Sequence, residues 1–209
     1  MSTKRKRENV ESLHIALLST FFVVLIWSVI NPQDLFTWFL EVLPALIGLV
    51  VIIATYNRFR LTNFLYFLLL IHAIILIVGG HYTYAEMPLF NWLRDTFHLD
   101  RNYYDRLGHF AQGFIPAIIV REILLRKSRL NRGKLLSFII ISICLAISAF
   151  YELVEWWVAM ATGSAADVFL GTQGDIWDSQ WDMFMALWGA TISLATMSHI
   201  HDKFLRNKC

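Results

Sequence analysis

Long apolar runs dominate the chain, and short polar segments separate them. Six of these runs can each cross a bilayer as a helix, because a hydrocarbon core of about 30 Å needs about 20 helical residues. The runs cover residues 13–30, 36–56, 62–79, 107–125, 135–160 and 182–200. An open sheet is excluded, because unpaired backbone groups are too costly in hydrocarbon. The pattern therefore predicts an all-α, polytopic membrane bundle of six transmembrane helices, which forms one membrane domain over residues 1–209.

The longest connection, residues 80–104, contains a further amphipathic segment. Pro88 suits the first turn of a helix. The apolar side chains that then share one face are Leu89, Trp92, Leu93 and Phe97. A short helix of this kind lies in the plane of the membrane interface. The alternative is a loop that packs on the bundle.

Composition and charge add the orientation of the bundle. The chain is 57% hydrophobic and 16% charged, whereas soluble domains are about a quarter charged. Lysine and arginine gather in residues 4–7, in the connections 57–61 and 126–134, and in the tail after residue 200, while the connections 31–35 and 161–181 contain neither. Cytoplasmic segments of membrane proteins carry this excess of positive charge. The distribution predicts that both termini are cytoplasmic.

The same distribution bears on the partners of the protein. A basic stretch such as residues 4–7 resembles a nucleic-acid patch in isolation, but beside an apolar run it acts as a topology signal. We therefore expect membrane lipids as partners and no nucleic acid, and the sequence identifies no protein partner.

Acidic residues gather at the predicted outer ends of four spans. Asp175, Asp178 and Asp182 follow one another at i, i+3 and i+7 before the last span. On a helix this spacing places them on one face. Asp105 and His109 share a face at i, i+4 at the start of the fourth span.

The fifth span adds Glu152 and Glu155 at i, i+3 toward the same end, and the second span adds Glu41. Carboxylates inside a bilayer usually face the bundle interior or a water-filled cavity. Two such charges about 4 Å apart repel by roughly 4 kcal/mol at an effective dielectric constant of about 20. Bound protons, a bound cation or nearby arginines must therefore compensate; the arginines of this region are Arg94, Arg101 and Arg106.

One histidine among several carboxylates suits a divalent metal ion such as Mg²⁺, Mn²⁺ or Zn²⁺. The candidate ligands are Asp105, His109, Glu152, Glu155, Asp175, Asp178 and Asp182. His109 and Glu155 are the candidate catalytic residues, with His109 as a ligand or a general base. The alternative is a hydrogen-bonded network that holds the helices together, in which Arg106 pairs with an aspartate.

Other polar residues have simpler expected positions. Those expected to reach the inner interface are His14, Arg121, Glu122, His199 and His201. Long side chains near a span end extend toward water in this way. His72 lies near the middle of the third span, where an interior histidine with a hydrogen-bond partner is expected.

Three motifs carry a resemblance to a known family. They are Tyr104-Asp105-Arg-Leu-Gly-His109-Phe, Tyr151-Glu152-Leu-Val-Glu155-Trp156, and the acidic segment from Gly171 to Met183. The chain resembles the YjdF-type family of bacterial inner-membrane proteins, which carry a domain of unknown function. The resemblance covers nearly the whole chain and implies a multi-pass protein of the bacterial inner (plasma) membrane, without an established activity.

A fainter similarity to VanZ-like membrane proteins, which are linked to glycopeptide-antibiotic tolerance, lies in Asp105-x-x-x-His109-Phe. Arg106 and Glu155 stand where those proteins carry lysine and glutamine, so we transfer no residue role from them.

Three functional hypotheses follow. The favoured one is a metal-assisted hydrolase or transferase that acts on a lipid-linked substrate at the outer leaflet, where the acidic cluster is expected. The second is a structural or regulatory membrane protein with a buried polar network. The third is an ion-coupled transporter whose pathway includes Glu41, Glu152 and His72.

Overall fold

The computed structural model describes residues 3–163 and 167–206, and within these ranges it is helical, with no strand. The helices are α1 (Thr3–Ser28), α2 (Leu35–Thr55), α3 (Asn63–His81), α4 (Pro88–Phe97), α5 (Tyr104–Lys127), α6 (Lys134–Thr162), α7 (Asp167–Leu170) and α8 (Asp178–Arg206). In the described part of the chain, 6 helices are long and apolar enough to cross a membrane, and they match the predicted spans. The prediction of an all-α bundle with six spans is confirmed.

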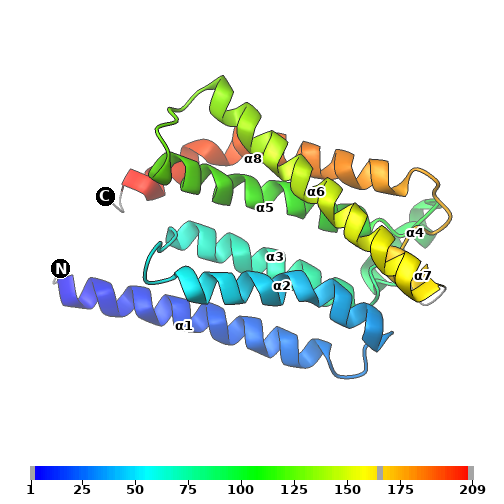
Figure 1. Cartoon of the computed structure of the whole chain (residues 1–209). Coiled ribbons are helices and arrows are strands. Elements are labelled where there is room, and N and C mark those ends of the chain that lie inside the picture. The colour runs from blue at the N-terminus through cyan, green and yellow to red at the C-terminus, as the bar shows by residue number, and fades with distance from the viewer. Residues whose placement is uncertain (1–2, 164–166, 207–209) are drawn as a thin grey trace.

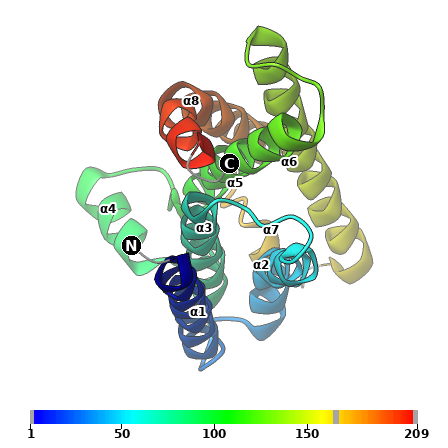
Figure 2. The same cartoon turned by 90° about the vertical axis from the view of Figure 1, so that its left-hand side faces the viewer.

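The long helices form two groups (Figures 1 and 2). Helices α1, α2 and α3 pack together, and α5, α6 and α8 form the second group, with α3 lying against α5 between them. Helix α1 begins and α8 ends at the same end of the bundle, which we call the terminal end. The opposite end is called the distal end below. The assignment of the terminal end to the cytoplasm stays a prediction.

Two glycines bring the backbones of α5 and α8 into contact. A Cβ atom at Gly113 would lie 1.9 Å from the carbonyl oxygen of Ala186, and one at Gly189 would lie 2.1 Å from that of Phe110. Small residues allow membrane helices to approach this closely. Because the acidic motifs lie on α5 and α8, this contact determines how near their side chains come to one another.

Tyr84 joins the distal ends of α3 and α5. Its ring occupies the space above two glycines, since a Cβ atom would lie 2.3 Å from the ring at Gly79 and 2.9 Å from it at Gly108. The ring is buried, and burial raises the pKa of the Tyr84 phenol well above its ordinary value. Tyr84 is therefore uncharged, and its ring sets the spacing of α3 and α5.

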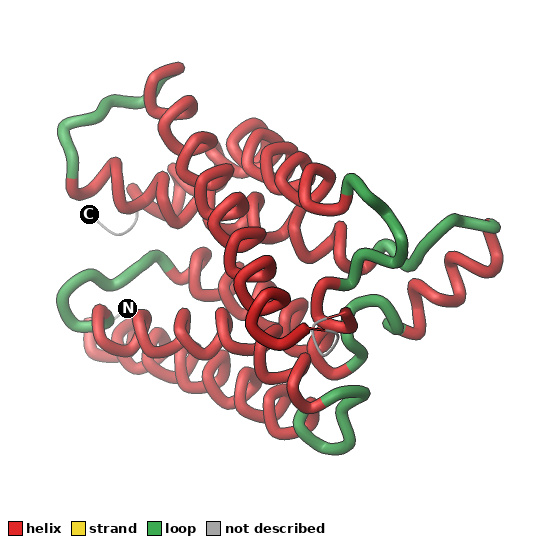
Figure 3. Tube along the Cα trace, turned by 45° about the vertical axis from the view of Figure 1, so that its right-hand side comes forward, coloured by secondary structure: helices red, strands yellow, loops and turns green. Residues whose placement is uncertain are grey.

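Helix α4 forms where Pro88 predicted it, and it projects from the distal end (Figure 3). None of its residues is buried. Its apolar side chains are open to the surroundings, with Leu89 55%, Trp92 59% and Phe97 63% exposed. The alternative of a loop packed on the bundle is wrong. An exposed apolar face on a short helix suits the membrane interface.

At the terminal end, several polar side chains that were expected to reach water are buried. Glu122 and His201 are fully buried, and Arg121 is 5% exposed. The Glu122 carboxylate accepts hydrogen bonds from the backbone and hydroxyl of Thr62, at 3.0 and 2.8 Å, and lies 2.9 Å from Nε2 of His201. Helices α3, α5 and α8 converge at this point, so these charged side chains pair with one another instead of reaching water. The expectation for Arg121, Glu122 and His201 was wrong.

The tautomer of His201 follows from its partners. Arg121 Nη1 lies 2.8 Å from His201 Nδ1, and a guanidinium group can only donate. Nδ1 therefore accepts, and Nε2 carries the proton that it donates to Glu122. We call this cluster of Thr62, Arg121, Glu122 and His201 the terminal network.

Three further histidines, His14, His72 and His199, had an expected position. His199 is exposed, as expected. His14 is half-buried and hydrogen-bonded to the Tyr56 hydroxyl at 2.6 Å and to Asn63 at 3.0 Å, so its expected exposure was wrong. His72 was expected to have an interior partner, but its Nε2 atom is buried and has none among the described residues.

Candidate functional site

The predicted site residues meet at the distal end of the second helix group. Helix α5 carries Asp105 and His109, α6 carries Glu152 and Glu155, α8 carries Asp178 and Asp182, and the segment before α8 carries Asp175. The helical spacing thus brings together residues that lie more than 70 positions apart in the sequence.

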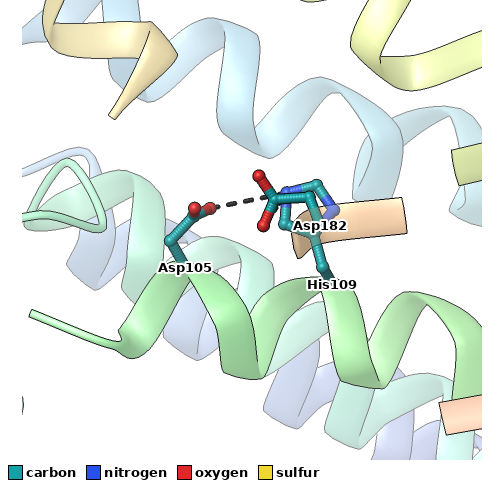
Figure 4. A group of neighbouring side chains, drawn as sticks. All are labelled: Asp105, His109 and Asp182. Atoms are coloured by element: carbon teal, nitrogen blue, oxygen red, sulfur yellow. Dashed lines mark ion pairs between the residues drawn. The ribbon is translucent and has the colours of Figure 1, made fainter. Parts of the chain in front are cut away.

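Three side chains converge between α5 and α8 (Figure 4). Nε2 of His109 lies 3.5 Å from Oδ1 of Asp105 and 3.7 Å from Oδ1 of Asp182. The His109 and Asp182 side chains are 7% and 3% exposed. One potential ligand atom from each residue lies within 4.8 Å of the others. We call Asp105, His109 and Asp182 the distal triad.

Gln112 orients the imidazole of His109. Its Oε1 lies 3.0 Å from His109 Nδ1, and an amide oxygen can only accept, so Nδ1 carries a proton. Nε2 of His109 then points toward the two aspartates, where it can carry a second proton or bind a cation. Metal-binding histidines are held in this way, with the second ring nitrogen donating to a neighbouring acceptor.

A second group shares the same histidine. One potential ligand atom from each of His109, Glu152 and Glu155 lies within 4.8 Å of the others. Oε1 of Glu152 lies 3.8 Å from Nδ1 of His109, and it is buried without a hydrogen-bond partner among the described residues. A buried carboxylate oxygen without a donor is costly. This oxygen therefore has an unused capacity to bind a proton or a cation.

Two buried arginines bind the aspartates of α8. Oδ1 of Asp178 accepts from Arg101 Nη1 at 2.5 Å and from Arg106 Nη2 at 2.6 Å. Arg106 also donates through Nη1 to Oδ1 of Asp182, and its Nη2 lies 3.2 Å from Oδ2 of Asp175. The pairing of Arg106 with an aspartate, which the alternative of a polar network required, is present.

These pairings divide the predicted ligands into two sets. Asp175 and Asp178 face arginines, which already supply positive charge to their carboxylates. Asp182 also binds Arg106, and Asp105 lies 3.6 Å from both arginines, but these two carboxylates have Nε2 of His109 within 3.7 Å as well. The distal triad is therefore the best-formed candidate cation site, and Glu152 and Glu155 lie on the other side of the histidine ring.

Carboxylates outnumber guanidinium groups in this region. Glu41, on α2, is a further acid that is only 7% exposed. Two buried arginines, Arg101 and Arg106, pair with four of these acids, Asp105, Asp175, Asp178 and Asp182. Since clustered anions repel strongly away from water, the cluster requires protons or a cation in addition to the two arginines.

The sequence did not reveal how two distant loops join beside the site. The side chain of Gln173 accepts from the backbone N–H of Asn102 at 2.9 Å and donates to its carbonyl at 3.0 Å. Arg101 donates to the carbonyl of Gly171 at 3.0 Å. A glutamine between Gly171 and Gly174 is a signal of a constrained turn, but nothing in the sequence pairs it with Asn102.

Comparisons with known proteins agree with the fold. A family model described as a predicted membrane protein (DUF2238) matches residues 13–203. The chain is 47% identical over 187 residues to the inner membrane protein YjdF of Escherichia coli (strain K12), and the alignment covers 90% of each chain. No solved structure matches, and the fainter similarity to VanZ-like proteins is not shown by these matches.

The matched region covers four candidate spans in full and most of the first and last, and it includes every residue of the distal triad. Both the family description and the relative are those of membrane proteins, and the relative belongs to the inner membrane. The chain is therefore a multi-pass inner-membrane protein that belongs to the DUF2238 family.

Proposed function

We propose that the protein is a metal-assisted hydrolase or transferase that acts on a lipid-linked phosphate at the outer leaflet of the inner membrane. The observation that carries this proposal is the distal triad. His109 Nε2 lies 3.5 and 3.7 Å from two carboxylate oxygens while Gln112 holds its other ring nitrogen. This donor set, at one end of a membrane bundle, supports a divalent cation more directly than any other part of the described chain.

The spacing of the triad suits such a cation after a small contraction. Zn²⁺ and Mg²⁺ bind nitrogen and oxygen ligands at about 2.0–2.2 Å, which corresponds to donor atoms about 3–3.5 Å apart. The observed separations of 3.5 and 3.7 Å are slightly larger. The imidazole ligand favours Zn²⁺ or Mn²⁺ over Mg²⁺, which prefers oxygen.

The residues on the two sides of His109 would have different roles in the reaction. A divalent ion on the triad would activate water and polarise a phosphoryl oxygen. Glu155, on α6, would act as the general base that removes a proton from the attacking group. Arg106, through Asp182, would hold one ligand in place, as hydrogen-bonded partners of metal ligands do.

The surroundings of the site support a lipid substrate. Trp177, just before α8, and Trp181, in its first turn, are 59% and 49% exposed, and Ile176 is 85% exposed. Exposed aromatic side chains at the end of a span suit the level of the lipid headgroups. Helix α4 lies at the same end of the bundle (Figure 3), and its apolar side chains Leu89, Trp92 and Phe97 are exposed. A phosphate on a membrane-anchored lipid would lie at this level.

The test is phosphate release in proteoliposomes that contain phosphatidic acid or a polyprenyl pyrophosphate, with Mg²⁺, Mn²⁺ or Zn²⁺ supplied. We expect metal-dependent release that falls at least about 100-fold in Glu155→Gln and His109→Ala, since a general base contributes about 10²–10⁴-fold. Arg94→Ala, which removes a partly exposed ion pair with Asp95, serves as the control with full activity. Folded protein that releases no phosphate from either lipid with any of these metals would refute the proposal.

The polar-network hypothesis remains the second candidate, because Arg101 and Arg106 both bind Asp178 inside the bundle. It expects that Asp178→Asn lowers stability and that no substitution abolishes a specific activity. The transporter hypothesis has less support. Buried apolar side chains, including Leu65, Ile115 and Ile118, lie between the distal triad and the terminal network in the described structure.

A further inference from the structure

Basic residues gather at the terminal end of the bundle, away from the distal triad. Residues 56–62, between α2 and α3, and residues 126–134, between α5 and α6, both lie at this end (Figures 1 and 2). These two segments contain no acidic residue. Their basic residues are Arg58, Arg60, Arg126, Lys127, Arg129, Arg132 and Lys134. Positive charge at the ends of spans lies at the level of the lipid headgroups, where it attracts anionic lipids.

The ring of Phe59 joins the two segments. The guanidinium carbon of Arg126 lies 4.0 Å from the centroid of this ring, and Nζ of Lys127 lies 5.3 Å from it. Aromatic rings attract cations at these distances. Arg126 also donates to the backbone carbonyl of Arg60 at 2.8 Å. Two cations at the end of α5 are therefore held against the segment that carries Arg58. We call Arg58, Phe59, Arg126 and Lys127 the basic surface.

Carboxylates compensate only part of this positive charge. Arg126 lies 2.6 Å from a carboxylate oxygen of Glu122, so its charge is shared with the terminal network. Arg58 and Lys127 are exposed, and neither forms an ion pair with a carboxylate among the described residues. The basic surface therefore offers accessible positive charge to an anion from outside the protein.

The position of Lys127 favours a lipid over a soluble acidic partner. Ile123 lies four residues before Lys127 on α5, and residues four apart share one face of a helix. Ile123 is 41% exposed although it belongs to a candidate membrane span. One face of α5 thus presents an exposed apolar side chain and, one turn nearer the terminal end, an exposed ammonium group. An acyl chain and its phosphate headgroup have the same arrangement.

We propose that the basic surface binds an anionic phospholipid. The phosphate contacts Lys127 and Arg126, Arg58 adds positive charge beside them, and an acyl chain lies along the face of α5 that carries Ile123. A zwitterionic lipid binds less tightly, because its own ammonium group would lie among these cations. The site is at the opposite end of the bundle from the distal triad. It is independent of the proposed function, and either can hold without the other.

The experiment measures equilibrium binding of two phospholipids to the purified full-length protein in a mild non-ionic detergent. Dioleoyl phosphatidylglycerol is the anionic probe, and dioleoyl phosphatidylcholine has the same chains with a zwitterionic headgroup. We expect phosphatidylglycerol to bind at least about tenfold more tightly, because each lysine or arginine near an anionic lipid surface contributes about fivefold. Glycerol phosphate, which has no acyl chain, should not displace the lipid at the same concentration. Equal binding of the two lipids, or displacement by glycerol phosphate, would overturn the proposal.

Two double substitutions with the same loss of charge test the location. Arg58→Gln with Lys127→Gln removes the exposed cations of the basic surface and should abolish the preference for phosphatidylglycerol. Lys203→Gln with Arg206→Gln removes one lysine and one arginine from the last turn of α8 and should leave the preference unchanged. All four side chains are exposed, so both variants should unfold at the temperature of the unmodified protein. An equal loss of preference in the two variants would show that net charge alone attracts the lipid, and it would contradict a site at Phe59.

Discussion

At the scale of single residues, Asp182 belongs to two structures at once. Its Oδ1 accepts from Arg106 and lies 3.7 Å from His109 Nε2. Arg106 also binds Asp178 at 2.6 Å. The guanidinium group of Arg106 and the imidazole of His109, both on α5, thus approach the same carboxylate oxygen of Asp182. This sharing couples the stability of the bundle to the geometry of the candidate metal site.

Substitution of Arg106 tests this coupling. Arg106→Ala should lower the free energy of unfolding by about 3–5 kcal/mol, because it leaves Asp178 and Asp182 buried with one partner fewer. The stability of Arg106→Lys should lie between those of the unmodified protein and Arg106→Ala. Lysine keeps the charge but cannot bridge two carboxylates as a planar guanidinium group does. The measurement is reversible unfolding of the purified protein in mild detergent.

Arg94→Ala is the matched control for Arg106→Ala. Arg94 pairs with Asp95 at 2.9 Å, with side chains 33% and 67% exposed. Exposed pairs contribute about 0–1 kcal/mol, so this variant should be close to the unmodified protein. Equal stability of the two alanine variants would contradict a structural contribution of the Arg106 pairs.

At the scale of the elements, the contact of α5 with α8 positions every member of the distal triad. Gly113 and Gly189 allow it, because each lies against the backbone of the other helix. The apolar runs in the sequence predicted both helices from length alone. They did not reveal which glycines meet, since a glycine inside an apolar run is compatible with contact, with a kink or with exposure to lipid.

Gly113→Ala should therefore separate α5 from α8. The added methyl group would lie 1.9 Å from the Ala186 carbonyl oxygen, and we expect a loss of at least about 2 kcal/mol in stability, as for overpacked cores.

Gly48→Ala is the control, because a Cβ atom there meets nothing within 4 Å. Alanine favours a helix over glycine by about 1 kcal/mol, so that variant should be as stable as the unmodified protein or more so. A thermal unfolding series of the two variants distinguishes these outcomes, and an equally stable Gly113→Ala protein would show that the helices are not in close contact.

At the scale of the whole molecule, two polar clusters lie at opposite ends of the α5–α8 pair. The sequence predicted the distal one, because helical spacing and the alternation of spans place acids from several helices at one depth. It did not predict the terminal network. Charged residues at a span end are compatible with exposure or with burial, and only the convergence of three helices on Glu122 and His201 decides between them.

The orientation of the bundle provides a test at this scale. The distribution of lysine and arginine predicts a cytoplasmic terminal end and a distal end that faces outward. In a variant with both native cysteines replaced, a new cysteine at Asp95, on α4, should react with a membrane-impermeant maleimide in intact spheroplasts. A cysteine at Arg129, between α5 and α6, should react only after permeabilisation. The reverse pattern would place the distal triad on the cytoplasmic side and contradict an outer-leaflet substrate.

The proposed function depends first on whether a divalent cation binds the distal triad. It is tested most directly by the metal content of the protein purified in mild detergent, alongside His109→Ala, Asp182→Asn and His199→Ala. His199 is an exposed histidine of α8 and is the matched control. We predict near-stoichiometric metal in the unmodified protein and in His199→Ala, and its loss in the other two variants. Folded, unmodified protein that holds no metal after incubation with Mg²⁺, Mn²⁺ and Zn²⁺ would contradict the claim and favour a polar network that binds the helices together.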